Sequence, residues 1–89
     1  MIKIVVYFED QSPKEKPTEL AGLSKRLNIV GLQPVQGDVF DYQDISTEDK
    51  DRIAHLNSGP INKLIVKSRK FTFENYYAGL HIFLESKKD

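Results

Sequence analysis

Residues 73–86, with the sequence FENYYAGLHIFLES, decide the fold of this chain because they form the last predicted element and fit either a strand or a helix. As a strand, alternation runs from Ala78 to Leu84 and leaves Tyr77 and Phe83 on the polar side. Gly79 weakens either element, by about 1 kcal/mol in a helix interior. As a helix, the segment has an apolar residue at every position of the template i, i+3, i+4, i+7, i+10 and i+11. The fuller match predicts a helix through Phe73, Tyr76, Tyr77, Leu80, Phe83 and Leu84.

Working outward from this segment, the amino terminus predicts a strand followed by a helix. Residues 2–8 are a nearly continuous apolar run, typical of a strand buried on both faces. Ser12 and Glu15 form a capping box around Pro13, and leucines at helical spacing follow. Pro17 conflicts with a helix that begins at Ser12, so the helix either kinks there or begins there. The helical leucines are Leu20, Leu23 and Leu27.

The middle of the chain predicts three more strands and one more helix. Residues 29–35 form a second strand, and Ser46 with Asp49 starts a second helix as a capping box. That helix stops at residues 57–60, where Asn-Ser-Gly-Pro cannot continue it. Residues 61–66 form a third strand, residues 67–70 a polar turn and residues 71–73 a brief fourth strand.

This order of elements predicts an α/β fold with a four-stranded mixed sheet and helices on both faces. The alternative is a ferredoxin-like α+β sandwich, which would split residues 29–43 into a hairpin that turns at residues 36–38. With 89 residues, the chain forms one domain, residues 1–89.

Composition narrows the functional classes. The 13 basic and 13 acidic residues balance, which argues against a dedicated nucleic-acid binder. No apolar run approaches the length of a membrane span, so no membrane partner is expected. Cysteine is absent, which excludes disulfides and thiolate chemistry and favours a cytoplasmic location. His55 and His81 have no companions at metal-ligand spacing, so neither a metal nor another cofactor is expected.

The order of elements and several landmarks resemble the glutaredoxin branch of the thioredoxin-like fold, particularly small bacteriophage glutaredoxins. The resemblance covers nearly the whole chain and implies a βαβαββα fold. Pro60, before the third predicted strand, occupies the place of the family's proline and is implied to be cis. The stretch Thr72-Phe73-Glu74-Asn75 is similar to the family's last helix start but lacks its glycines, and residues 37–41 are similar to the phage loop.

The family's reactive cysteines are missing from this sequence. In the family, a Cys-x-x-Cys motif lies at the turn that reads Gln11-Ser12-Pro13-Lys14-Glu15 here. Without a thiolate, no disulfide can be attacked, so the resemblance implies a redox-inactive member that has kept its surface. The candidate binding residues at the corresponding positions are Gln11, Ser12, Pro13, Lys14, Gly59, Pro60, Phe73 and Glu74.

Function is therefore expected to be non-catalytic binding of a protein partner, plausible for a phage or mobile-element protein that modulates a host or viral protein. Exposed aromatic residues are typical anchors at protein interfaces, and the candidates are Phe40, Tyr42, Tyr76 and Tyr77. A second hypothesis is nucleic-acid binding through the basic patch Lys67, Arg69 and Lys70. A third is glutathione binding that uses the hydroxyl of Ser12 or Tyr7, for which helix capping and core packing are the simpler roles.

Overall fold

The computed structural model describes residues 2–9, 16–54 and 61–87, in which two strands begin the order of elements, two strands end it, and the helices and one short strand lie between them. A short 3₁₀ helix, η1 (Tyr42–Asp44), precedes the second α-helix. The helices are α1 (Ala21–Val30) and α2 (Thr47–Ile53), and the strands are β1 (Ile2–Phe8), β2 (Thr18–Glu19), β3 (Val39–Asp41), β4 (Lys63–Phe73) and β5 (Ala78–Ser86).

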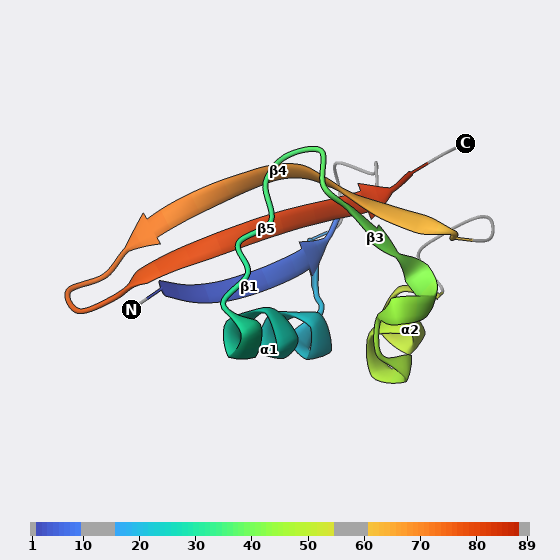
Figure 1. The fold of residues 1–89 in the computed structure, drawn as a ribbon, viewed down its shortest axis with the longest axis horizontal. Helices are drawn as coiled ribbons and strands as arrows, with labels where there is room; N and C mark the ends of the chain where they lie inside the picture. Colours follow the sequence, from blue (N-terminus) through green and yellow to red (C-terminus); the bar gives the residue numbers. More distant parts are fainter. Residues whose placement is uncertain (1, 10–15, 55–60, 88–89) are drawn as a thin grey trace.

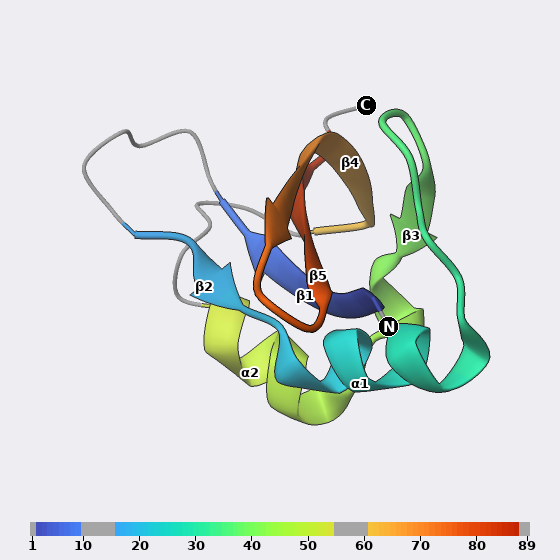
Figure 2. The same ribbon diagram turned by 90° about the vertical axis from the view of Figure 1, so that its left-hand side faces the viewer.

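The strands form one mixed sheet in the order β2-β1-β5-β4-β3 (Figure 1). The first and last strands lie side by side as a parallel pair, and the other neighbours are antiparallel. Both helices lie on the same face of the sheet (Figure 2). The α/β class is thus confirmed. The prediction of four strands with helices on both faces is wrong, because five strands are present and one face carries both helices.

The closing segment is a strand, so the predicted helix over residues 73–84 is wrong. Its buried residues are Gly79, Leu80, Ile82 and Leu84, and from Leu80 onward they alternate with half-buried residues. Three of the residues that completed the helical pattern are instead exposed: Phe73, Tyr76 and Tyr77. Pairing with β1 on one side and β4 on the other overrides the helical spacing, because a strand between two neighbours satisfies its backbone on both sides. A closing helix of the glutaredoxin type is therefore replaced by β5.

β4 is one long strand rather than two strands joined by a turn. The predicted turn at residues 67–70 lies inside it, next to an irregularity in the pairing between Val66 and Ser68. A bulge of this kind absorbs one extra residue and lets the strand continue.

The first helix is shifted along the chain relative to its prediction. It begins at Ala21 and continues to Val30, where Gly31 ends it with a left-handed φ of 73°. Residues 29–35 therefore do not form the predicted second strand, and the short β2 precedes the helix instead. The ferredoxin-like alternative fails at the same place: Gln36 and Gly37 do turn, but no strand leads into them.

One hydrophobic core lies between the sheet and the two helices. The predicted leucines of the first helix belong to it, and so do alternate residues of the three long strands. Its members are Ile4, Val6, Phe8, Leu20, Leu23, Leu27, Ile45, Ile53, Leu64, Val66, Leu80, Ile82 and Leu84.

The buried carboxylate of Asp49 joins the two helices. Ser46 caps α2 as predicted, its hydroxyl accepting from the Asp49 N–H. The Asp49 carboxylate accepts from the N–H groups of Gly22 (3.2 Å) and Leu23 (2.8 Å), at the start of α1. A negative charge suits this end of a helix, because the first amides have no partner within the helix. Asp49 therefore takes the place of an N-terminal cap for α1, where Leu20 provides no side-chain cap.

Candidate protein-binding surface

One edge of the sheet is closed by side chains of α1. β2 covers only the end of β1, at Tyr7 and Phe8. Further back, Asn28 accepts from the Ile4 N–H and donates to the Ile4 carbonyl, both at 2.8 Å. The backbone of Val6 is satisfied in the same way, by the hydroxyl of Ser24 and the amide of Leu20. Asn28 thus supplies the two bonds that a neighbouring strand would supply.

The opposite edge is left open along half of β4. β3 pairs with Lys63–Ile65, and the adjoining Gly37 and Asp38 bond to Val66. Beyond that point, none of the described segments pairs with residues 69–73 on this side. An unpaired strand edge is a template for another strand, and proteins usually cover or shorten such edges. Among the described residues, one edge is covered and the other is left exposed.

The direction of the open backbone groups follows from the pairing of β4 with β5. The Glu74 N–H donates to the Tyr77 carbonyl at 2.9 Å. In an antiparallel pair, alternate residues bond to the same neighbour, so Thr72 and Lys70 also direct their backbone groups toward β5. Arg69, Phe71 and Phe73 therefore direct theirs away from the sheet.

The open edge carries aromatic side chains. The rings of Phe71 and Phe73 stack at a centroid distance of 6.5 Å, and the Arg69 guanidinium lies 5.5 Å from the Phe71 ring. Phe71 is 42% exposed and Phe73 is 80% exposed. Arg69 also donates to the buried Pro34 carbonyl at 3.4 Å, which limits where its side chain can point. Aromatic residues and arginine are the side chains that most often dominate the binding energy of protein interfaces.

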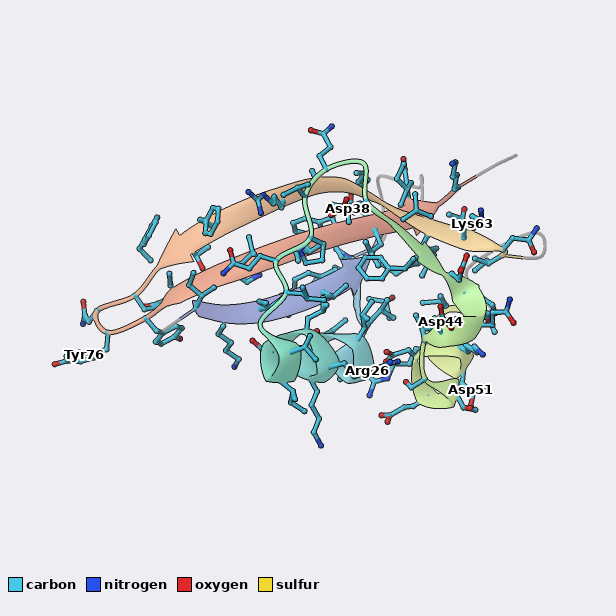
Figure 3. The ribbon with its side chains drawn as sticks, in the orientation of Figure 1. Arg26, Asp38, Asp44, Asp51, Lys63 and Tyr76 are labelled. Carbon is cyan, nitrogen blue, oxygen red and sulfur yellow. The ribbon has the colours of Figure 1, made fainter. Side chains whose placement is uncertain are left out.

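This part of the hairpin projects beyond the helices as an arm, which we define as residues 69–81 (Figure 1). Tyr76 lies at the far end and points away from the molecule (Figure 3), with 94% of its surface exposed. Beside it, a broad hollow of about 780 Å³ is lined by Tyr77, Ile2, Lys3 and Asn28. The arm therefore offers both an unpaired backbone edge and exposed rings.

The structure brings some predicted site residues together on this arm. Phe73 ends β4, and Glu74 follows it in the turn. Arg69 and Lys70 lie in β4 rather than at a hairpin tip, and Lys67 forms an ion pair with Glu9, so the basic patch is smaller than predicted. The predictions for Gln11, Ser12, Pro13, Lys14, Gly59 and Pro60, including the cis peptide bond at Pro60, lie outside the described residues.

The predicted exposed aromatic residues separate into two groups. Tyr76 and Tyr77 are exposed, which confirms the prediction that some of the four candidates are, whereas Phe40 and Tyr42 are half-buried against the core. A groove of about 340 Å³ opens between α1 and β3, next to Phe40. Arg26 crosses its end and donates to the Asp44 carbonyl at 2.7 Å (Figure 3).

Tyr7, the candidate for a glutathione-activating hydroxyl, lies in a cluster on the helix-free face. Its ring stacks on Phe83 and His81, with centroid distances of 5.3 and 5.8 Å. Its hydroxyl lies 3.3 Å from His81 Nδ1, and His81 Nε2 lies 3.1 Å from the Thr72 hydroxyl. Each polar group of the cluster has a partner within it, which favours the core-packing role for Tyr7. No set of three metal-ligating side chains occurs in the described ranges.

Comparison with known proteins gives no relative, since no protein-family model, curated protein or solved structure matches the chain. Within the described residues, neither helix is long and apolar enough to cross a bilayer. The function must therefore be inferred from the geometry of the arm.

Proposed function

We propose that this chain is a non-catalytic, redox-inactive binding protein that docks on a protein partner through the arm. The partner contributes an extended segment, which adds to the sheet as a new strand along residues 69–73. Main-chain hydrogen bonds supply affinity in this mode of recognition, and side chains on alternate positions supply specificity.

The difference between the two edges of the sheet is the observation that carries the proposal. At the β1 edge, Asn28 and Ser24 satisfy backbone groups that would otherwise attract a strand. At the β4 edge, no described segment pairs with the outward-directed backbone groups of three alternate residues, Arg69, Phe71 and Phe73. Side chains of α1 protect the β1 edge from a further strand, and the β4 edge has no comparable protection among the described residues. We therefore interpret the open β4 edge as functional.

The proposal does not depend on a glutaredoxin-type fold. The docking edge is built from β4 and β5, and β5 stands where that fold has its closing helix. What the proposal keeps from the resemblance is the missing redox chemistry, a cytoplasmic location and a host or viral protein as the first partner to test.

A peptide selection tests this function directly. Random peptides displayed on beads are selected against the wild-type chain and against Phe71→Pro. Because the Phe71 N–H points away from β5, proline removes a docking donor without breaking a bond inside the sheet. Selected peptides should bind the wild type and lose binding to the variant by at least about tenfold. Phe71→Val, which keeps the N–H, is the matched control and should retain most of the binding. Peptides that bind Phe71→Pro as well as the wild type would falsify strand addition.

Nucleic-acid binding remains a second candidate because cationic and aromatic side chains lie close together on the arm. Single-stranded nucleic acids stack on such rings while cations contact their phosphates. The pairing of Lys67 with Glu9 and the zero net charge make this candidate weaker. It predicts binding to single-stranded DNA or RNA that falls steeply with salt, and no binding at low salt would remove it.

A further inference from the structure

The open edge of β4 is complementary to itself. Two copies of a strand can pair in antiparallel fashion around a two-fold axis, provided that outward-facing residues meet outward-facing residues. With Phe71 on the axis, Phe71 meets Phe71 of the second copy, and Arg69 meets Phe73. Each of these three residues offers one N–H and one C=O, so the pairing forms about six backbone hydrogen bonds.

The side chains agree with this register on both faces. On the helix side, two phenyl rings meet on the axis, and each Arg69 guanidinium meets the ring of Phe73, a favourable cation–π pair. On the opposite face, Lys70 faces Thr72 of the second copy and has two diagonal neighbours there, Glu74 and Lys70, so the opposite charge of Glu74 offsets the like charge of Lys70. Diagonal neighbours are about 7–8 Å apart, within reach of long side chains of opposite charge.

Two of the neighbouring registers bring like charges together. If Arg69 lies on the axis, it directly faces Arg69 of the second copy. If Arg69 meets Phe71, then Lys70 directly faces Lys70, and like charges in that position destabilise a sheet. With Thr72 on the axis, Lys70 directly faces Glu74 of the second copy, but only Phe71 and Phe73 are left to form backbone pairs. The register centred on Phe71 is favoured because it keeps the full length of the edge and still places Lys70 near Glu74.

The length of the open edge also matches the length that the symmetric pairing needs. At one end, Gly37 and Asp38 already occupy the backbone of Val66, and at the other end the strand turns at Glu74. The symmetric pairing needs residues 69–73 of each copy, which lie between these two limits.

We propose that a second copy of this chain is the strand that docks on the arm, so that two five-stranded sheets join into one continuous sheet through β4. This inference rests on the proposed strand addition and names its partner. The contact is short, at the low end of specific interfaces, so the dimer is weak and forms with a dissociation constant in the micromolar range or above.

Sedimentation measures the association from about 10 µM to 1 mM. The wild type should move from 10.2 kDa toward twice that mass as concentration rises. Phe71→Pro should stay at the monomer mass, and Phe71→Val should still associate. A wild-type chain that remains at 10.2 kDa throughout overturns the dimer. The peptide selection would then still decide whether the edge accepts a different strand.

A charge exchange tests the approach of Lys70 to Glu74 of the second copy without a proline. Lys70→Glu and Glu74→Lys should each weaken association about fivefold, because each places like charges on the diagonal twice per dimer. The double variant restores opposite charges and should return within about twofold of the wild type. Within one copy the two residues lie four apart on an extended strand, too far to compensate each other. A double variant as weak as the single ones would exclude this register.

Discussion

At the scale of single residues, the Asp49 carboxylate does the most for the fold. It is fully buried, and both of its oxygens accept amides at the start of α1. Gly22 is the residue that permits the approach, because a Cβ there would lie 2.6 Å from the Ser46 hydroxyl and 2.9 Å from the carboxylate. The contact therefore needs a small residue on one helix and an acid on the other.

Replacing Asp49 by asparagine should lower the free energy of unfolding by about 1–3 kcal/mol. The asparagine amide keeps one acceptor but turns an N–H₂ group toward a second donor, which leaves the Gly22 or the Leu23 amide without a partner. Urea unfolding measures the change. Asp51→Asn, on the exposed side of the same helix, is the matched control and should change little. Equal stability of the two variants would show that the buried carboxylate is not needed.

Gly79 makes a second close contact, across the arm. A Cβ at this position would lie 2.6 Å from the Thr72 hydroxyl and 3.2 Å from His81 Nε2. Gly79→Ala should therefore destabilise the chain by about 1–3 kcal/mol through overpacking. In a Thr72→Ala background the hydroxyl is gone, and the same substitution should cost clearly less. A double-mutant cycle of thermal unfolding reads the difference, and purely additive effects would rule out the contact as its cause.

At the scale of elements, α1 has two tasks: it covers the core and it completes the edge of β1. Leu23 and Leu27 serve the first task, and they were predicted from their spacing. Ser24 and Asn28 serve the second, which spacing alone does not reveal. A sequence signal existed, since two polar side chains four residues apart lie on one side of a helix. The role of these two side chains can be predicted only when the strand beside α1 is known.

Asn28→Ala should cost about 1–3 kcal/mol and expose the backbone of Ile4. The variant loses the bonds to the Ile4 N–H and C=O and leaves both without a partner. Chemical unfolding gives the stability, and amide hydrogen exchange gives the opening of Ile4. Lys25→Ala, an exposed change on the same helix, should leave both measurements nearly unaltered. Unchanged exchange at Ile4 in Asn28→Ala would contradict the role assigned to this side chain.

The bulge in β4 explains why that element was predicted in two pieces. Before it, the core-facing residues are Leu64 and Val66, at even positions. After it, the helix-side residues are Phe71 and Phe73, at odd positions, because one extra residue has been absorbed. Alternation counted straight through the strand places polar side chains in the core, so the sequence indicated a turn.

At the scale of the whole molecule, the first strand, the second helix and the α/β class were predicted from the sequence, whereas the number of strands and their topology were not. The closing segment fits a helix by its spacing and a strand by its neighbours, and only the assembled sheet decides between them. The candidate site was partly predicted, because exposed rings and cations lie together along the chain. Its defining property, an unpaired backbone edge, depends on strands that are distant in sequence.

The two edges of the sheet should differ in amide hydrogen exchange, measured on a dilute sample. The amides of Ile4 and Val6 should exchange slowly, because side chains of α1 accept from them. On β4, the amides of Lys70 and Thr72 should exchange slowly and that of Phe71 fast, since only the first two face β5. Uniform protection along β4 in dilute solution would show that its edge is covered within one chain.

Asn28 has a consequence for how large an assembly of this chain can grow. A sheet with two free margins adds copies without end, as filaments do, because each newcomer presents a fresh place to attach. In the described part of the chain, the backbone groups of Ile4 and Val6 are already bonded to α1 and the residue before it, so pairing through Phe71 uses the long open edge of each copy and favours a closed pair over a filament.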